Sequence, residues 1–200
     1  MKKEITRKKI LENRKKINKK TVVINSHKIL KKLFRMKEFC QAKKVMFYSS
    51  FGNEVNTEKM IKKSLELKKQ VFLPKILKGK IVPVQIESLK DLVCGKFGIP
   101  EPKTMNYEIR TMNSLDVIIV PGVAFDKNCN RIGFGKGYFD RFLRVQKAIN
   151  PALPKRICRK SGVKIGLAHN FQIVKKIPVS KNDVPTDLVI TEKNIFKRGK

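Results

Sequence analysis

The chain has 200 residues, 41% of them hydrophobic, which excludes a mainly disordered protein and allows a sizeable buried core. Its 47 Lys and Arg residues exceed its 16 Asp and Glu residues, giving a formal charge of +31 that favours attraction to polyanions. The basic residues are spread along the whole sequence. We therefore favour compositional drift in an AT-rich genome over a selected polyanion surface, and keep both explanations open.

The cysteines and the apolar segments exclude further classes. None of the four cysteines belongs to a C-x-x-C pair, so metal binding or redox chemistry through cysteine is not expected, and a reducing cytosol is the natural setting. The N-terminus is dense in charge and lacks the apolar core of a signal peptide. The longest apolar run, LDVIIVPGVAF, is too short to span a bilayer. We expect a soluble cytoplasmic protein without a membrane partner.

The first half of the chain reads as helices followed by strands. Residues 3–19 and 21–38 are expected to be helical, the second with Val22, Ser26, Ile29 and Leu33 on one face. VMFYSS (45–50) is a short buried strand, and Thr57 with Glu58 suits the start of a helix that runs to about Lys69. VFLP (71–74) is a strand stopped by Pro74, and IVPVQI (81–86) is another extended segment.

The second half alternates strands with helices. LDVIIVP (115–121) is the clearest strand, since nearly all of it is apolar and β-branched. A glycine-rich loop and a helix with Phe139, Phe142 and Leu143 follow, and VKIGLA (163–168) and DLVIT (187–191) are later strands. This order predicts a single α/β domain over residues 1–200, with N-terminal helices and a three-layer, open, largely parallel sheet covered by helices on both faces.

The stretch RIGFGKGYFD (131–140) is the strongest local candidate for a binding site. Alternating glycines let backbone N–H groups converge on an anion, and the helix that follows adds the positive end of its dipole. Arg131 and Lys136 would add charge. The stretch matches neither G-x-G-x-x-G nor G-x-x-x-x-G-K-[ST], so a plain glycine turn is an equal alternative. Asp140, in the first turn of the helix, could equally cap that helix or bind a metal.

Several blocks in register give a more specific indication. PGVAFDKNCNRIGFGKGYFDRFL resembles the signature region of the 5-formyltetrahydrofolate cyclo-ligase family, also called 5,10-methenyltetrahydrofolate synthetase. KEITRKKILENRKKI is similar to the opening Lys-x-x-x-Arg helix of that family. FGNEVNT, FGIPEP and GLAHNFQIVKKIPVSKNDVPTDLVIT follow the family pattern in the same order, so the resemblance covers nearly the whole chain.

The resemblance implies ATP- and Mg²⁺-dependent ring closure of 5-formyltetrahydrofolate. In that reaction the N5-formyl oxygen attacks the γ-phosphorus of ATP, N10 captures the resulting iminium phosphate, and loss of phosphate leaves 5,10-methenyltetrahydrofolate. Such a site has to align two substrates and neutralise phosphate charge. ATP and the folate are the expected partners, Mg²⁺ is the expected metal, and a monomer that binds no specific nucleic acid is expected.

The resemblance also assigns roles to residues of this sequence. It places Mg²⁺ on Asp140 and Asp183, and the folate on Glu54, Phe134 and Tyr138. It implies catalytic roles for Arg131, Lys136 and Tyr138. The nucleotide contacts fall on Lys3, Arg7, Arg131, Ile132, Gly133, Phe134, Gly135, Lys136, Gly137, Tyr138 and Phe139.

Each assignment has a plainer alternative. Lys3 and Arg7 lie in a helix crowded with lysine and would otherwise be a solvated face. Glu54 could be an ordinary loop charge, and Asp183 a turn residue before Pro185. The sequence departs from the family at Phe134, where tyrosine or arginine is common and a polar contact is therefore lost. It departs again at Phe139, where tyrosine is frequent.

Two other functions compete with the ligase. A nucleic-acid-binding module would use the +31 charge, but no zinc finger, RNP motif or interleaved aromatic pattern accompanies it. An inactive homologue that binds folate or nucleotide is the other, and the intact loop with Asp140 and Asp183 argues against it. Of the two histidines, His27 is expected to be solvated, and His169 is a weak candidate for the pocket without an expected catalytic role. No Ser-His-Asp or Cys-His arrangement is suggested.

Overall fold

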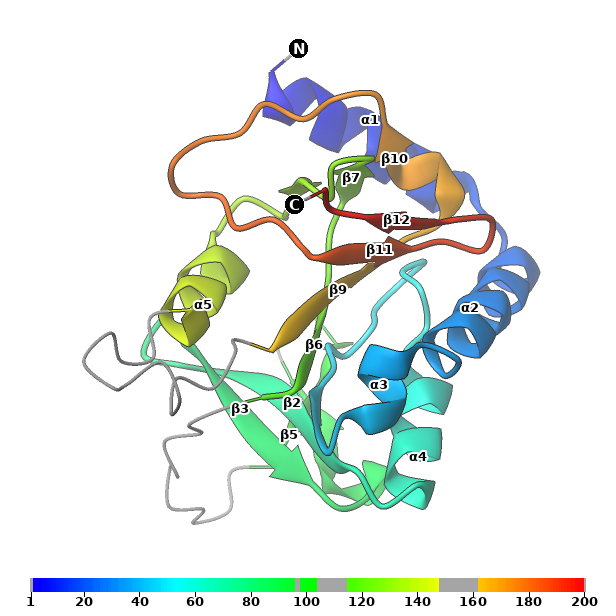
Figure 1. Cartoon of the computed structure of the whole chain (residues 1–200), viewed down its shortest axis with the longest axis vertical. Helices are drawn as coiled ribbons and strands as arrows, with labels where there is room; N and C mark the ends of the chain where they lie inside the picture. Colours follow the sequence, from blue (N-terminus) through cyan, green and yellow to red (C-terminus); the bar gives the residue numbers. More distant parts are fainter. Residues whose placement is uncertain (1, 96–97, 104–114, 148–161, 200) are drawn as a thin grey trace.

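A seven-stranded mixed sheet forms the centre of the protein, and helices lie on both of its faces (Figure 1). The computed structural model describes residues 2–95, 98–103, 115–147 and 162–199. The strand order is β12-β11-β9-β6-β1-β2-β3. The five inner strands run parallel and the edge strands β12 and β3 run antiparallel to their neighbours. The strands are β1 (Lys44–Met46), β2 (Gln70–Leu77), β3 (Lys80–Ile86), β6 (Val117–Val120), β9 (Val163–Leu167), β11 (Leu188–Ile190) and β12 (Ile195–Lys197). The predicted α/β architecture is confirmed.

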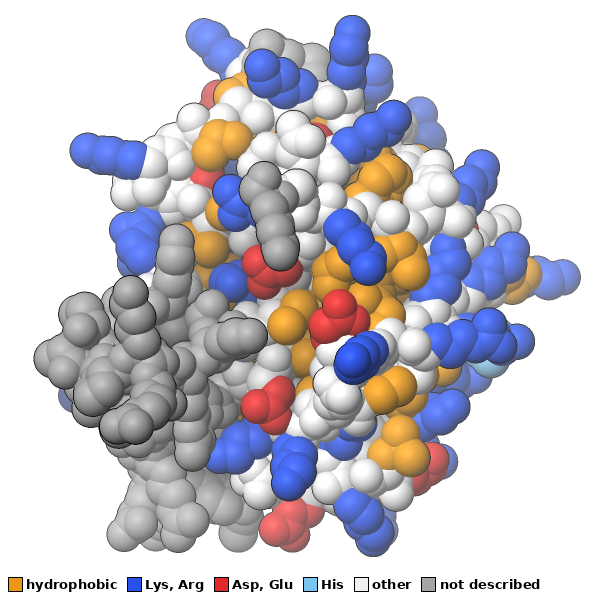
Figure 2. Space-filling model, viewed as in Figure 1, with side chains coloured by type: hydrophobic (Ala, Val, Ile, Leu, Met, Phe, Trp, Pro, Cys, Tyr) orange, Lys and Arg blue, Asp and Glu red, His pale blue; other side chains and the backbone are white. Residues whose placement is uncertain are grey.

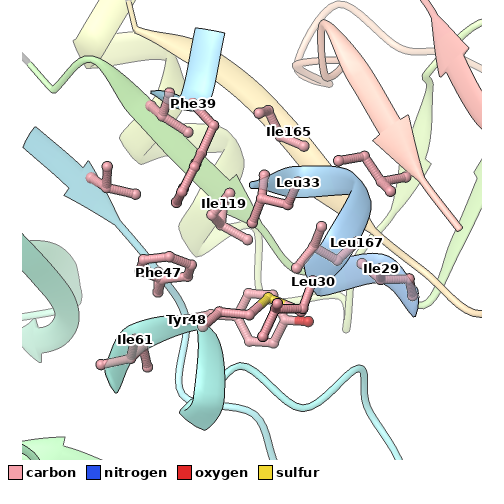
Figure 3. Close-up of a cluster of buried hydrophobic side chains, with 14 of the residues drawn as sticks. Ile29, Leu30, Leu33, Phe39, Phe47, Tyr48, Ile61, Ile119, Ile165 and Leu167 are labelled. Carbon is pink, nitrogen blue, oxygen red and sulfur yellow. The ribbon is translucent and has the colours of Figure 1, made fainter. Parts of the chain in front are cut away.

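Alternate residues of the inner strands pack on opposite helical layers. Helices α2 (Lys19–Leu33), α3 (Lys37–Gln41) and α4 (Glu58–Glu66) cover one face, and α5 (Tyr138–Lys147) covers the other (Figure 1). In β1, Val45 faces the α2–α4 layer while Met46 packs with Phe142 and Leu143 of α5. Figure 3 shows part of the larger cluster, with Leu33 and Phe39 near Ile119 and Ile165, and Ile29 near Leu167. Each such buried side chain contributes about 1.5–3 kcal/mol, which is why nearly continuous apolar runs mark these strands.

The first helix packs on a smaller sheet. In α1 (Lys3–Lys16), Ile10 is buried against Val123 and Ile132. This sheet has the order β10-β7-β8, with β7 (Ala124–Asp126), β8 (Arg131–Ile132) and β10 (Ile173–Val174). Asp126 fixes the β7–β8 turn, because its carboxylate accepts hydrogen bonds from the backbone of Asn128, Asn130 and Ile177. The hairpin thereby places the glycine-rich loop beside α1. The remaining short elements are η1 (Leu89–Asp91), η3 (Asn170–Gln172), β4 (Leu92–Cys94) and β5 (Pro100–Pro102).

Several boundaries differ from the sequence-based expectations; α4, for example, ends at Glu66 and not near Lys69. The first helix ends at Lys16, and the second ends at Leu33, so its predicted last turn belongs to a loop and to α3. Strand β2 continues through Pro74 to Leu77, although Pro74 was expected to stop it. Pro74 pairs with Pro83 of β3. Two facing prolines fit an antiparallel ladder at a non-hydrogen-bonded pair, where N–H groups point away from the partner strand.

Basic side chains are spread over the surface (Figure 2), as they are along the sequence. Figure 2 shows Lys and Arg side chains spread over the visible face, with single Asp and Glu residues between them. His27 is exposed, as predicted. None of the helices in the described part of the chain combines the length and hydrophobicity that a transmembrane segment needs.

Candidate active site

The candidate site lies at the carboxyl ends of β1 and β6. From β1 the chain proceeds through α4 to β2 on one side, whereas the strand on its other side is β6. Open sheets bind ligands where the connections diverge in this way, outside the carboxyl ends of the strands. Tyr48 and Ser49 follow β1, Pro121 follows β6, and all three line a cavity at this point.

The glycine loop, residues 133–137, owes its shape to two glycines and two arginines. Gly135 has φ +108° and Gly137 φ +66°, a region that favours glycine. Arg7 Nε donates to the carbonyl of Gly133 at 2.9 Å, and Arg141 Nη1 donates to the carbonyl of Lys136 at 3.0 Å. The loop is therefore held from α1 on one side and from α5 on the other.

One side of the loop forms a strongly charged cavity of about 480 Å³, which we call the basic cavity. Its cations come from α1, from the loop and from α5, and two carboxylates face them. Basic groups at this density are what an ATP polyphosphate requires. The charged residues that line it are Lys3, Arg7, Arg131, Lys136, Arg141, Arg144, Asp140 and Asp183.

Arg131 and Asp140 form the central ion pair of the basic cavity. Arg131 Nη2 donates to Asp140 Oδ1 at 2.7 Å, and the Arg131 side chain is only 3% exposed. Burial lowers the pKa of Arg131, while Asp140 and Asp183 oppose that change, so the guanidinium keeps its charge. Asp140 Oδ1 also accepts from the backbone N–H of Val184 at 3.1 Å. Neither donor belongs to α5, so Asp140 does not act as the cap of its own helix.

Asp183 is held by the N-terminal helix. Its Oδ2 accepts from Lys3 Nζ and from the backbone N–H of Ser180. Partial burial opposes ionisation, but these hydrogen bonds hold the pKa of Asp183 below its usual value. Arg144 Nη2 donates to the carbonyl of Asn182 at 2.7 Å and so ties this segment to α5.

The two carboxylates fit a magnesium ion that also binds phosphate. Hydrogen bonds engage Oδ1 of Asp140 and Oδ2 of Asp183, and an ionised carboxylate has further lone pairs that can bind a ligand. Hard oxygen donors suit Mg²⁺, which commonly takes one or two carboxylates together with substrate phosphates. Within the described ranges, no cluster of three or more His, Cys, Asp or Glu residues could hold a metal by itself.

The other side of the loop forms a mostly hydrophobic cavity of about 420 Å³, which we call the apolar cavity. Aromatic and aliphatic side chains of the β1 end, the β2–β3 hairpin and the loop surround it. Such a wall suits a flat heteroaromatic ring. Its apolar lining comprises Tyr48, Phe51, Pro74, Ile76, Ile81, Ile99, Pro100, Pro121, Phe134, Tyr138 and Phe139.

Glu54 is the buried acid of the apolar cavity. Its side chain is 6% exposed, and Oε1 lies 3.3 Å from Arg14 Nη1 while Oε2 accepts from the backbone N–H of Phe51 at 3.2 Å. Burial raises the pKa of Glu54 to about 7, against the opposing charge of Arg14 and these hydrogen bonds. The carboxylate can accept from N–H groups of a ring placed in the cavity.

The glycine loop separates the two cavities and lines both. Arg131, Gly133, Lys136, Gly137 and Asp140 contribute to each wall. A phosphate in the basic cavity and a ring substituent in the apolar cavity would therefore meet at this loop. This is the geometry that transfer between two bound substrates needs.

Every site residue proposed from the sequence lies at one of the two cavities. Phe134, Tyr138 and Phe139, which the resemblance also gave to ATP, line the apolar cavity and not the basic one. Glu54 shares their cavity. The basic cavity receives Lys3, Arg7, Arg131, Ile132, Gly133, Gly135, Lys136, Gly137, Asp140 and Asp183. His169 is fully buried among other elements and lines neither cavity.

Sequence reasoning missed three arginines. Arg141 and Arg144 of α5 line the basic cavity, and Arg14 contacts Glu54. Arg14 follows Arg7 by two helical turns, so the two arginines lie on the same face of α1. This spacing is the signal that could have identified Arg14. For Arg141 and Arg144 the abundance of basic residues hid any signal.

Comparisons with known proteins show which family the chain belongs to. A sequence profile of the 5-formyltetrahydrofolate cyclo-ligase family matches residues 1–192. The probable 5-formyltetrahydrofolate cyclo-ligase of Caenorhabditis elegans is 37% identical over 169 residues, covering 80% of this chain and 78% of the relative. The 5-formyltetrahydrofolate cyclo-ligase of Escherichia coli K12 is 29% identical over 156 residues, covering 76% and 80%.

A solved structure gives the same answer for the fold. The 5,10-methenyltetrahydrofolate synthetase of Aquifex aeolicus superimposes with a TM-score of 0.78 at 34% identity, covering 98% of this chain and 93% of that one. The profile match, the relatives and the shared fold extend over nearly the whole sequence. The chain therefore belongs to the 5-formyltetrahydrofolate cyclo-ligase family of enzymes, whose members are ligases.

Proposed function

We propose that this protein converts 5-formyltetrahydrofolate to 5,10-methenyltetrahydrofolate with ATP as co-substrate, releasing ADP and phosphate. The main support for the proposal is that the glycine loop lines the basic cavity on one side and the apolar cavity on the other. The names of the relatives supply the two ends of the reaction, since one gives the formyl substrate and the other the methenyl product.

ATP is assigned to the basic cavity and the folate to the apolar cavity. Lys3, Arg7 and the loop would bind the phosphates, while Glu54 would accept N–H groups of the pterin between aromatic side chains. Asp140 and Asp183 would hold Mg²⁺, which when bound neutralises charge on the transferred phosphoryl group.

The reaction would begin with attack of the N5-formyl oxygen on the γ-phosphorus of ATP. A new P–O bond forms, the bond to the β-phosphate oxygen breaks, and ADP leaves with that electron pair. Arg131 lines both cavities and would stabilise the negative charge that shifts between these oxygens. Lys136 of the loop and Tyr138 at the start of α5 are the other proposed contributors.

Ring closure would follow within the apolar cavity. N10 attacks the activated carbon, N10 loses its proton, and the carbon–oxygen bond breaks to release inorganic phosphate. The new C–N bond leaves the methenyl cation. No step requires a protein nucleophile, which agrees with a site built from cations, carboxylates and aromatic rings.

Purified protein incubated with 5-formyltetrahydrofolate, ATP and Mg²⁺ tests the proposal. We expect the absorbance of the methenyl product to appear only when all three are present, together with stoichiometric ADP. A folded protein that binds both substrates without forming product would be an inactive homologue. We further propose that residues 1–200 form a single domain, since the family profile matches residues 1–192, and that the protein acts as a monomer.

A further inference from the structure

Arg14 is a buried cation that lines neither cavity as far as the described residues define them. Its side chain is 8% exposed, in a helix whose other basic side chains are more open to solvent. A buried arginine is retained only with partners that compensate its desolvation. Its partners therefore indicate what it does.

Among the described residues, the ion-pair and cation–π partners of Arg14 belong to the apolar cavity. Arg14 Nη1 lies 3.3 Å from Glu54 Oε1. The guanidinium carbon lies 5.6 Å from the ring centroid of Phe51 and 5.3 Å from that of Phe134, within cation–π range. The two rings are themselves 5.6 Å apart. One guanidinium thus joins the acid and two aromatic side chains of the same wall.

The backbone connects the same segments. Asn53 Nδ2 donates to the carbonyls of Arg14 and Ile17, both at 2.9 Å, and so satisfies carbonyl groups at the end of α1. Residues 51–54 are consequently fixed to α1 by Asn53 and Glu54 together. Phe134 reaches the same guanidinium from the glycine loop.

We propose that Arg14 is a positioning residue of the folate site, which aims Glu54 into the apolar cavity and holds Phe51 and Phe134 together as one aromatic wall. This inference rests on the proposed function, because it concerns the subsite assigned there to the folate. Arg14 would govern affinity for the folate and leave affinity for the nucleotide nearly unchanged, since its side-chain contacts lie on the folate side of the loop.

Several ionisable groups face Glu54 besides Arg14. Tyr48 lies at the end of β1, and His169 follows β9, close to the backbone of Asn53 and Glu54. Across the cavity stand Glu101, Arg131, Lys136 and Asp140. Arg14 is the one with a direct ion pair to Glu54 among the described residues. Its removal should therefore favour the protonated acid and move the acid limb of folate binding to higher pH.

The variant Arg14→Met tests the proposal. The control is Lys15→Met, which removes the same charge from an exposed position of the same helix. We expect the dissociation constant for 5-formyltetrahydrofolate, measured calorimetrically without ATP, to rise at least about tenfold, or about 1.4 kcal/mol. KM for ATP should change less than about twofold. The acid limb of kcat/KM for folate should move to higher pH, and Lys15→Met should reproduce the wild type.

Arg14→Lys separates charge from shape. Lysine keeps the charge but lacks the planar guanidinium, so the acid limb should return toward the wild-type position while folate affinity stays reduced. This variant also replaces Arg14→Met if the latter does not fold. Unchanged folate affinity, or equal losses for folate and ATP, would overturn the proposal. Absence of turnover in the wild type would instead refute the proposed function, and calorimetric folate binding would still test Arg14.

Discussion

The basic cavity and the apolar cavity share the glycine loop but handle charge in opposite ways. In the basic cavity, cations outnumber carboxylates, and hydrogen bonds keep the pKa of Asp183 below its usual value. In the apolar cavity, burial raises the pKa of the acid Glu54 to about 7 even though Arg14 lies beside it. The ionised form of a carboxyl group is thus stabilised in the basic cavity and destabilised in the apolar cavity.

This difference matches the two proposed ligands. A polyphosphate needs many donors and tolerates water, so partly exposed cations suffice. A pterin needs a dry aromatic slot with few polar groups, and a polar group in such a slot gains selectivity because leaving it unpaired is costly. Variants on each side of the loop should therefore fail in different ways.

The largest effect is expected on the basic side, for Asp140→Asn. Asparagine keeps the shape of the side chain but removes the negative charge that pairs with Arg131. It also removes one of the two proposed carboxylate ligands of the metal. We expect kcat to fall by about 10²–10³-fold. The rate of methenyl formation measures this, while circular dichroism and thermal melting check the fold. Glu66→Gln, on the exposed face of α4, is the matched control and should keep the wild-type rate. Wild-type turnover of Asp140→Asn would refute the role assigned to Asp140.

On the apolar side, Glu54→Gln should change how stability depends on pH. The carboxyl has a pKa of 4.5 when unfolded and about 7 when folded, so the folded state binds more protons between these values and its stability falls as pH rises through them. The variant lacks this loss. Its unfolding free energy relative to wild type should therefore increase by about 2–3 kcal/mol from pH 5 to pH 8.

Urea unfolding of both proteins at the two pH values measures this difference. His169 contributes with the opposite sign, because burial lowers its pKa, but the histidine is common to both proteins and cancels in the subtraction. Parallel pH dependences for the two proteins would show that Glu54 is not buried as an acid. Folate binding should be weakened in the variant at every pH above 7.

The sequence could predict the features that carry a hydrophobic pattern or an unusual concentration of one residue type. Val117–Val120 was identifiable as a strand because both faces of it are buried, and the amphipathic face of α2 fixed its position. The glycines and cations of residues 131–137 indicated an anion site. The family resemblance then placed Asp183, whose partner Lys3 lies 180 residues away in sequence.

The remaining features depend on packing that no local pattern records. Strands β8 and β10 have two residues each, which is too short for periodicity, yet they carry the loop and its support. Spacing puts Arg14 on the same helix face as Arg7, but only the packing of Glu54 and Phe134 against it shows that it is buried. The extension of β2 beyond Pro74 depends on a partner strand with a proline at the opposite position.

A smaller effect is expected from the glycine loop itself. Gly135→Ala should cost about 1–2 kcal/mol of stability because of φ +108°, and should raise KM for ATP several-fold by moving the loop away from Arg7. Gly79→Ala is the matched control, since it has φ +73° and open space in the β2–β3 turn. The control should lose similar stability in thermal melts without a change in KM. Equal kinetic effects in both variants would exclude a specific role for the loop shape.

The smallest effect is expected at Phe134, where the chain departs from its family. Phe134→Tyr keeps the aromatic ring against Arg14 and Phe51. Phe134 is 44% exposed, so the added hydroxyl can stay in contact with solvent. KM for folate should stay within about twofold of wild type. Phe134→Leu removes the cation–π contact and should raise that KM by about two- to fivefold, in line with 0.5–1 kcal/mol for an exposed contact. A tenfold lower KM for folate in the Phe134→Tyr variant would instead mean that a hydroxyl contact is missing here.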